Sequence, residues 1–430
     1  MKHRFLLVVF AIVGLCCTAC SNNAEIKEEN VSRIIKTLSA DDMKGRHAFS
    51  PEIRDAANFI AEEFQMIGLS PLPGQGDFLQ DFSIYSISPS ETEVLVNGNK
   101  VSEQHYFGLL NEESFTWQHP DADILYIGED DNFRETFRTF VSNDEQNMVA
   151  VHEGHEKWFH RYRTYFNRSN RSFEVDQEPS DVFVLTSSRI RSYEVSYQNH
   201  VKAIPLFNVA GMIEGKRSNE IVLITAHYDH IGVISPMDDD SVANGANDNA
   251  SGVAGLIETA RYYSNRPQPE RTIYFVGFTA EEPGGYGSKY FSEQIDPTAV
   301  TAMVNIEMIG KPAIEGPDSG WITGYNYSDL GKILQSSTAD SSFVFYPDPY
   351  PNQNLFFRSD NAPFAMLGIP AHSISTTPID MDQDYHRVTD EFKTLDIPHT
   401  THTIQAIAKG MEPIISAEQT PTRINPDSLR

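Results

Sequence analysis

The chain has 430 residues, of which 40% are hydrophobic, so it is long enough to form one large α/β domain together with a smaller one. Its 60 acidic residues outnumber its 33 basic residues, which gives a formal net charge of −27 at pH 7. A surface of that charge repels nucleic acid and anionic lipid head groups, so the composition argues against a protein that follows phosphate backbones.

The first 20 residues have the pattern of a targeting segment. Basic residues precede an apolar stretch from Phe5 to Leu15 that is too short to span a bilayer. The residues before Cys20 resemble a bacterial lipoprotein signal, in which the cysteine becomes the acylated first residue; the alternative is a secretory signal cleaved near Ala19. We therefore expect residues 1–19 to be a signal peptide and residues 20–29 a tether. The protein would be lipid-anchored in the bacterial cell envelope, in the periplasm or at the cell surface.

All three cysteines of the chain lie in this targeting segment, at Cys16, Cys17 and Cys20. The mature protein therefore has no thiol for a disulfide, a zinc finger or nucleophilic catalysis. Any metal ion must be held by histidines and carboxylates.

The segment from Val31 to Leu69 is predicted to be mainly helical. Ser50 and Pro51 predict the start of a helix, with Ser50 as the N-cap and Pro51 at the first helical position. Apolar residues then recur at helical spacing until Gly68, which predicts the helix end. This pattern is typical of an amphipathic helix that packs on a core.

Between about residues 87 and 200 the chain has short apolar runs, such as VLVNGNKV and NMVAVH, separated by polar loops. This pattern predicts a small β-rich insert. The stretch HEGHEKWFH, from His152 to His160, lacks the i, i+4 histidine pair of a helical zinc motif. We therefore interpret this stretch as a solvated loop and not as a metal site.

From Asn219 onward, short β-rich runs alternate with helical patterns. This alternation predicts an α/β fold with a mostly parallel, mixed sheet flanked by helices on both faces. In such sheets ligands bind at the carboxyl ends of the strands, where His227, the pair Glu281-Glu282 and Glu307 fall. The expected strands are Ile221–Ala226, Thr272–Phe278, Val300–Ile306 and Ala371–Ser375, and the expected helices are about 250–264, 284–294, 328–338, 360–367 and 397–411.

Six histidines and acids in this region could serve a metal site. His227 and Asp229 form an H-x-D motif, in which Asp229 could orient the imidazole. Asp248 lies in a Gly- and Asn-rich loop, where it could bind metal or cap the following helix.

Glu281-Glu282 and Glu307 sit at or within apolar runs, where a carboxylate costs desolvation energy unless a cation compensates it. That cation could be a metal ion or a structural Arg or Lys. His386 follows Tyr385 late in the chain.

The motifs H-x-D, N-D-N-x-S-G, E-E, N-x-E-M-x-G and Y-H occur in an order that closely resembles the co-catalytic zinc exopeptidases, the family of bacterial aminopeptidases, glutamate carboxypeptidases and glutaminyl cyclases. The resemblance covers about 205–410, with weaker support from LSADDMKGR near the N-terminus. It implies a phosphorylase/hydrolase-like catalytic domain over residues 30–86 and 201–430. The insert at 87–200 stands where relatives carry a protease-associated domain, although its sequence matches poorly.

The resemblance also implies a role for each motif residue, and two zinc ions per chain. One zinc would be held by His227 and Glu307, the other by Glu282 and His386, and Asp248 would bridge them. Glu281 becomes the general base, Asp229 supports His227, and Tyr385 donates a hydrogen bond to the oxyanion. The Asp248-Asn249 peptide bond is expected to be cis.

Two departures from the family pattern stand out. Glu307 is one methylene longer than the aspartate usual in the aminopeptidases, and Asn361 replaces a frequent histidine in RSDNAPFAMLGIP. In this segment Arg358 and Asp360 could contact the ends of a substrate, or they could form a local ion pair.

The sequence therefore predicts a zinc-dependent exopeptidase, most simply an aminopeptidase, that hydrolyses peptide bonds by attack of a di-zinc-bound hydroxide with Glu281 as base. The alternatives are a carboxypeptidase and a glutaminyl-cyclase-like acyltransferase that uses one zinc. A non-enzymatic binding protein is disfavoured because every expected ligand is present. The expected partners are peptide substrates, with no nucleic acid and with membrane contact only through Cys20; the sequence indicates no oligomeric state.

Overall fold

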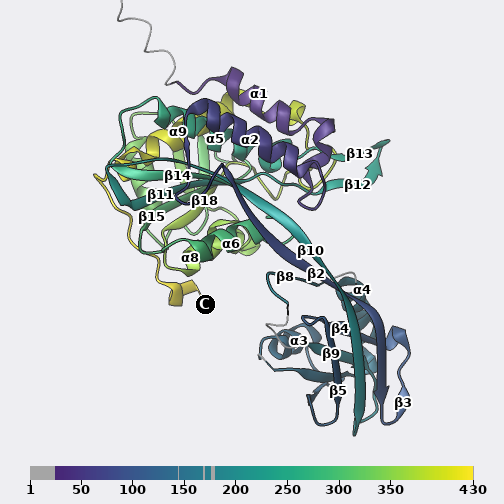
Figure 1. The fold of residues 1–430 in the computed structure, drawn as a ribbon. Helices are drawn as coiled ribbons and strands as arrows, with labels where there is room; N and C mark the ends of the chain where they lie inside the picture. Colours follow the sequence, from purple (N-terminus) through teal and green to yellow (C-terminus); the bar gives the residue numbers. More distant parts are fainter. Residues whose placement is uncertain (1–24, 144, 168–169, 176–179, 430) are drawn as a thin grey trace, which may run out of the picture. The chain divides into compact units, whose positions relative to one another are not determined.

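The computed structural model describes residues 25–143, 145–167, 170–175 and 180–429 (Figure 1). The predicted signal peptide and Cys20 lie outside the described residues. Within these ranges, no helix is both long enough and apolar enough to cross a membrane. The described chain forms two compact units: a smaller unit, Asp81–Leu206, and a larger unit made of the residues before and after it.

The larger unit is built on a mixed sheet whose central strands are parallel. β11 (Arg217–His227) pairs in parallel with β14 (Arg271–Phe278) on one side and with β15 (Val300–Ile306) on the other. β18 (Ala371–Ser375) continues the parallel part beside β15. Antiparallel neighbours flank this centre, namely β10 (Tyr193–Ile213) beside β14 and β16 (Ser319–Ile322) beside β18, with β17 (Val344–Pro347) outermost.

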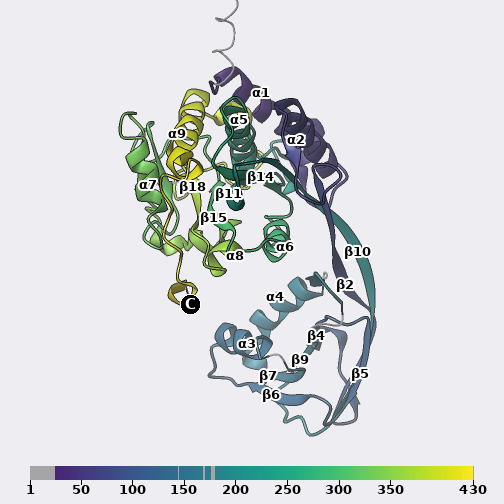
Figure 2. The ribbon, with the colours of Figure 1, turned by 60° about the vertical axis from the view of Figure 1, so that its left-hand side comes forward.

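Helices cover both faces of this sheet, which is why its strands are apolar on both sides. In β11, Val222 and Ile224 belong to one core cluster, whereas Leu223 belongs to the cluster on the opposite face. In Figure 2, α6 and α8 lie on the face opposite the other five helices. The helices are α1 (Glu28–Leu38), α2 (Ile53–Ile67), α5 (Gly252–Ser264), α7 (Leu330–Ser337) and α9 (Ile397–Ile415) on one face, and α6 (Tyr286–Gln294) and α8 (Asn361–Met366) on the other.

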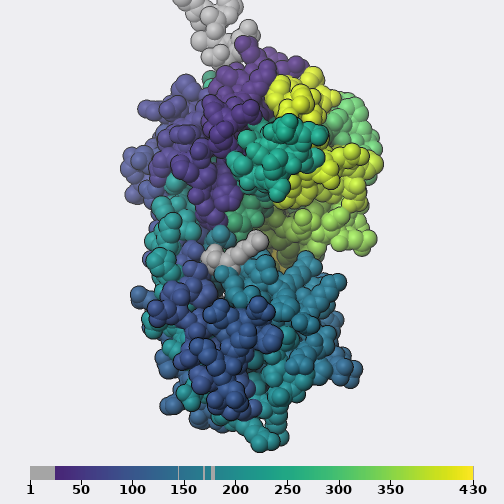
Figure 3. Space-filling view, turned by 90° about the vertical axis from the view of Figure 1, so that its right-hand side faces the viewer, coloured from purple at the N-terminus to yellow at the C-terminus, as the bar shows by residue number. Residues whose placement is uncertain are grey.

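The helices on the larger face pack against one another. α1 contacts both α5 and α9, and Figure 3 shows α1 in purple beside α5 in teal and the yellow C-terminal helix. The predicted fold class, a mostly parallel mixed sheet between two helical layers, is confirmed.

The predicted start of α2 is wrong. The helix begins at Ile53, with Glu52 as its N-cap, and Ser50 Oγ has no hydrogen-bond partner among the described residues. Residues 51 and 52 form a turn before the helix. The predicted end at Gly68 is confirmed, because this glycine adopts φ +87° and its N–H donates to Phe64 O.

The smaller unit contains a four-stranded sheet and two helices. β7 (Asn147–Val151) lies between β6 (Asp123–Ile127) and β9 (Asp181–Leu185) and is parallel to both, and β4 (Tyr106–Leu109) pairs with β9. The helices are α3 (Phe133–Val141) and α4 (Glu156–Phe166). Four further strands lie wholly or mainly in this unit, namely β2 (Leu79–Val96), β3 (Asn99–Lys100), β5 (Ser114–Gln118) and β8 (Asn170–Ser172). The short strands β1 (Ser70–Pro71), β12 (Gly232–Met237) and β13 (Asp240–Ala243) belong to the larger unit.

The interpretation of HEGHEKWFH as a solvated loop is wrong for its second half, which forms the start of α4. Phe159 is fully buried and packs on Phe107, and the partly buried Tyr162 and Phe166 of the same helix pack against this cluster. The expected insert boundaries, 87 and 200, fall inside the long strands β2 and β10. A boundary within a continuous strand leaves no change of composition to detect.

Candidate metal centre

The residues expected to bind metal come together at the carboxyl ends of the parallel strands. His227 is the last residue of β11, and Glu307 follows the last residue of β15. Glu281 and Glu282 follow β14 after two residues. Since these strands are neighbours and run in the same direction, their ends meet at one edge of the sheet.

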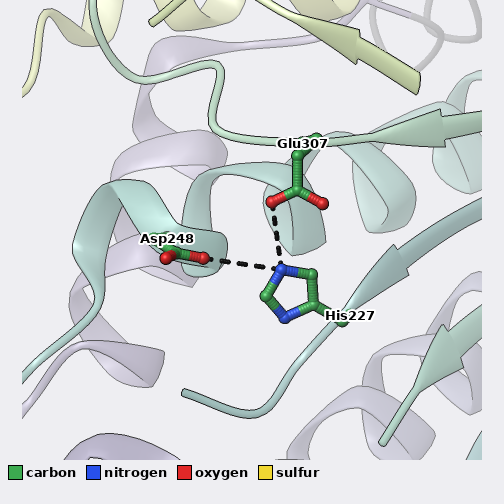
Figure 4. A group of neighbouring side chains, drawn as sticks. All are labelled: His227, Asp248 and Glu307. Atoms are coloured by element: carbon green, nitrogen blue, oxygen red, sulfur yellow. Dashed lines mark hydrogen bonds and ion pairs between the residues drawn. The ribbon is translucent and has the colours of Figure 1, made fainter. Parts of the chain in front are cut away.

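His227, Asp248 and Glu307 form what we call the first ligand group. His227 Nε2 lies 3.0 Å from Glu307 Oε1 and 3.5 Å from Asp248 Oδ1, and Figure 4 shows both acids directed at this nitrogen. The other ring nitrogen, Nδ1, lies 3.2 Å from the carbonyl oxygen of Asp229. A metal-binding histidine usually coordinates the ion through one ring nitrogen and donates the N–H of the other nitrogen to an acceptor, and His227 can do both.

Glu282, His386 and Asp248 form the second ligand group, and His230 lies against its two acids. His386 Nε2 lies 3.1 Å from Glu282 Oε2 and 3.3 Å from Asp248 Oδ2. His230 Nδ1 lies 2.9 Å from Glu282 Oε1 and 3.6 Å from Asp248 Oδ2. Asp248 therefore presents one oxygen to each group, which is the position of a bridging carboxylate.

Backbone and side-chain contacts hold Asp248 in this position. Asp390 accepts hydrogen bonds from the backbone N–H groups of Asn247 and Asp248, at 2.9 and 3.0 Å. The Asp248-Asn249 peptide bond is cis, as predicted. The alternative role as a helix cap falls to Asn249, whose Oδ1 accepts from Gly252 N at 3.0 Å.

Asp229 is fully buried and supports more than His227. Its carboxylate accepts from the backbone N–H of Glu281 at 3.0 Å and of Glu282 at 3.3 Å. Burial raises the pKa of this carboxyl to about 6, although His227 partly offsets the effect. Both groups of Asp229 approach the imidazole: its carbonyl oxygen lies 3.2 Å and its Oδ1 3.8 Å from His227 Nδ1. The carboxylate also fixes the turn that carries the two glutamates.

Glu281 lines the cavity between the two groups. Burial raises its pKa well above the ordinary value, with the nearby charges of Asp360 and Glu307 acting in the same direction. A carboxylate with a raised pKa beside a reaction site is suited to accept and return a proton.

The electrostatics of the centre favour binding of a cation. Burial would lower the pKa of His227, yet the charges of Glu307 and Glu281 raise it well above its usual value. His386 behaves alike: hydrogen bonds to Asp248 and Glu282 outweigh burial and raise its pKa to about 10. In the ranges that the structure covers, no Lys or Arg forms an ion pair with any acid of the two groups. The buried Arg46 lies within electrostatic range of Asp248 and Glu282 but forms no ion pair with either among the described residues, and histidine and carboxylate donors without an ion-paired Lys or Arg fit divalent metal ions.

Tyr385 and Arg358 both line the cavity. The Tyr385 ring stacks on His386, with centroids 3.9 Å apart, and burial raises the pKa of its hydroxyl, which therefore remains an O–H donor. Among the residues that the structure describes, Arg358 donates a single long hydrogen bond of 3.5 Å, to Gln353 O. Asp360 differs from the expected substrate contact: it is buried, does not line the cavity and lies within electrostatic range of Glu281.

Two residues of this centre had no role in the sequence prediction. His230 immediately follows the H-x-D motif, so its position after a strand end was the available signal. Arg46, in LSADDMKGR, is fully buried and donates to the backbone oxygens of Tyr228, Asn244 and Gly245 at 2.7 to 2.9 Å. These bonds tie together the two loops that carry His230 and Asp248.

The sequence of this chain is similar to those of known proteins. The model of peptidase family M28 matches residues 208–411. A probable zinc metalloprotease of Pyrenophora teres f. teres is 26% identical over 200 residues, which cover 45% of this chain and 40% of that protein. Probable leucine aminopeptidase 1 of Trichophyton verrucosum is 25% identical over 338 residues, covering 74% of this chain and 87% of that protein. The chain thus spans less than half the length of the zinc metalloproteases that it matches.

Solved structures share the fold. An aminopeptidase from Aneurinibacillus sp. strain AM-1 superposes with a TM-score of 0.54 at 18% identity, over 91% of this chain and 94% of its own. A glutaminyl cyclase from Porphyromonas gingivalis gives a TM-score of 0.51 at 12% identity, over 91% and 99% of the two chains. At these identities the likeness concerns the fold alone.

Proposed function

This chain belongs to peptidase family M28 through residues 208–411, and we propose that it is a zinc-dependent exopeptidase, specifically an aminopeptidase, that uses two zinc ions. The observation that carries the proposal is the pair of ligand groups that share Asp248, with Glu281 beside them in one cavity. The donors are imidazole nitrogens and carboxylate oxygens, which zinc binds readily. His227 and Glu307 would hold one ion, and Glu282 and His386 the other.

Zinc bound by these residues would supply Lewis-acid chemistry: it would polarise the substrate carbonyl and lower the pKa of the attacking water. Glu281 takes a proton from the water whose oxygen attacks the peptide carbonyl carbon, and returns it to the amine that leaves when the C–N bond breaks. The Asp229 carboxylate keeps Glu281 in place by accepting a hydrogen bond from the backbone N–H of Glu281. Tyr385 donates its O–H to the oxygen that becomes negative during the reaction. The apolar side chains of Met308, Trp321 and Ile379 line the same cavity and would receive a substrate side chain.

Several observations favour an aminopeptidase over its alternatives. The first ligand group is complete, which supports a two-metal peptidase over a one-metal cyclase. The similarity to a leucine aminopeptidase over 87% of that protein points the same way. Arg358 in the cavity wall is the feature that favours a carboxypeptidase, because a guanidinium can bind a terminal carboxylate.

The test is hydrolysis by the full mature chain of three substrates: leucine p-nitroanilide, its N-acetylated counterpart and an N-blocked peptide with a free carboxylate. We expect cleavage of the first alone. Glu281→Gln should lower kcat by about 10²- to 10⁴-fold with the zinc content unchanged, because the substitution removes only the proton acceptor. Unimpaired hydrolysis by this variant, or cleavage only of the N-blocked peptide, would overturn the assignment.

The position of the protein in the cell envelope is a further part of the proposal and rests on the N-terminal sequence. A lipid on Cys20 would hold the mature chain at a membrane. Cys20→Ser should move the protein from the membrane fraction to the soluble fraction; equal membrane association of both forms would contradict a lipid anchor.

A further inference from the structure

His230 is buried against the two acids of the second ligand group. Its side chain has no exposed surface, and its Nδ1 faces Glu282 Oε1 at 2.9 Å. An imidazole in this place could bind the second metal ion through Nδ1, or it could donate an Nδ1–H hydrogen bond to Glu282. The two roles place the ring proton on different nitrogens.

The environment of the other ring nitrogen separates these roles. An imidazole that binds metal through one nitrogen carries its proton on the other, and that N–H almost always finds an acceptor. His227 meets this condition through Asp229 O. His230 Nε2 is buried without a hydrogen-bond partner in the described part of the chain. A proton on Nε2 would therefore be unpaired, whereas a proton on Nδ1 is paired with Glu282.

Glu307 in the first ligand group provides a matched case. Its Oε1 faces His227, while its Oε2 accepts a hydrogen bond from Ser359 Oγ at 2.8 Å. Glu282 is arranged in the same way: Oε2 faces His386, and Oε1 faces His230. In Glu307 and in Glu282, one carboxylate oxygen therefore faces the histidine of its ligand group, and the other oxygen contacts a residue outside the group. That residue is Ser359 for Glu307 and His230 for Glu282.

The backbone around His230 is shaped to hold this ring. Gly245 has φ +58°, and a Cβ on it would lie 2.6 Å from His230 Cγ, so a larger residue there would collide with the ring. The backbone N–H of His230 donates to Arg46 O at 3.2 Å. The ring has little freedom to swing away from Glu282.

We propose that His230 is a positioning residue that donates its Nδ1–H to Glu282 Oε1 and so turns Oε2 toward the second metal position. The inference rests on the proposed function, because it concerns one of the two zinc sites. His386, the other imidazole at Glu282, lies in a loop with 36% of its side chain exposed. The buried hydrogen bond therefore supplies the fixed orientation that the loop histidine alone does not provide.

The experiment compares His230→Asn and His230→Leu in the full mature chain by zinc titration against a chelator of known affinity. The asparagine places an amide N–H close to the position of Nδ1, so this variant should keep both ions. The leucine has no donor, so one of the two ions should bind about 10- to 100-fold more weakly and the other unchanged. His160→Leu, which removes an imidazole from the smaller unit, is the control and should bind zinc like the wild type.

Two results would overturn the positioning role. Unchanged affinities in His230→Leu would mean that Glu282 needs no support from this ring. Loss of an ion in His230→Asn would mean that His230 is itself a ligand, and this variant decides the question even if His230→Leu does not fold. Failure of the proposed function looks different, because the wild type would then bind no zinc.

Discussion

The two ligand groups differ in the elements that carry them. The first group takes His227 and Glu307 from the ends of β11 and β15, which are adjacent and hydrogen-bonded up to Thr225 and Asn305. The second group takes Glu282 from the turn after β14 and His386 from the loop between β18 and α9. Strand pairing brings His227 and Glu307 of the first group together, whereas Glu282 and His386 of the second group need side-chain contacts that fix a turn and a loop.

Lys311 is the contact that fixes the loop of His386. Its Nζ lies 2.5 Å from Asp382 and 2.8 Å from Asp384, two residues before His386. Lys311 itself follows Glu307 by four residues, so this pair of bonds ties the loop to the strand end that carries the first group. The difference between the groups therefore lies in how each is supported, and substitutions should affect them unequally.

The largest effect is expected at Asp248, the residue that the groups share. Asp248→Asn removes the carboxylate that faces both positions, so both ions should be weakened and hydrolysis should fall roughly 10³-fold or more. Glu307→Ala should instead remove one ion and leave the other. Metal analysis of both variants checks this, and an Asp248→Asn protein that keeps two tightly bound ions would contradict the shared position.

A buried histidine inside a strand should behave unlike those at the strand ends. His372 on β18 lies 2.8 Å from Thr323 O through Nδ1 and 2.7 Å from Ser328 Oγ through Nε2, and burial lowers its pKa to about 4. Because the unfolded chain takes up this proton near pH 6.5, the contribution of His372 is complete above pH 6.5. It is lost as the pH falls toward 4, by roughly 3 kcal/mol.

This effect is measured as the free energy of unfolding of the metal-free protein at pH 7 and pH 4.5. His372→Gln should lose less stability than the wild type over this interval, because glutamine does not titrate. His402→Gln removes a partly exposed histidine and serves as the control. Equal losses in all three proteins would show that His372 is not the source of the acid sensitivity.

The smallest effect is expected from the loop contact. Lys311→Met should weaken the ion of the second group by about 10-fold, in the range found for residues that support metal ligands, and should leave the first ion unchanged. Lys393→Met is a matched control, since Lys393 is an exposed lysine paired with Glu391. Equal weakening of both ions in the Lys311 variant would remove the distinction between a strand-built and a loop-built group.

The same distinction explains what the sequence could predict. Apolar runs that end in His227 or Glu307 mark buried strands with a polar residue at the exit, and parallel order brings such exits together. The central strands and the helices between them were therefore predictable to within a few residues. The family resemblance supplied the pairing of Glu282 with His386, because no local pattern relates a turn to a loop about one hundred residues later.

Other features depended on contacts that a linear pattern does not contain. His230 gains its role only because Gly245 and Arg46 place its ring against Glu282. Asp360 was expected either at the end of a substrate or in a local ion pair, because it lies in the segment RSDNAPFAMLGIP; the fold buries it, and it does not line the cavity. α4 in the smaller unit was missed because its apolar face consists only of aromatic residues, Phe159, Tyr162 and Phe166, and two of them lie beyond the stretch HEGHEKWFH that was interpreted.

The most direct test of the account is the zinc content of the wild-type mature chain and of His386→Ala after dialysis against buffered zinc. We expect two zinc ions per chain in the wild type and one in His386→Ala, because the first ligand group does not use His386. A wild-type protein with one ion or none, or a variant that still holds two, would contradict it.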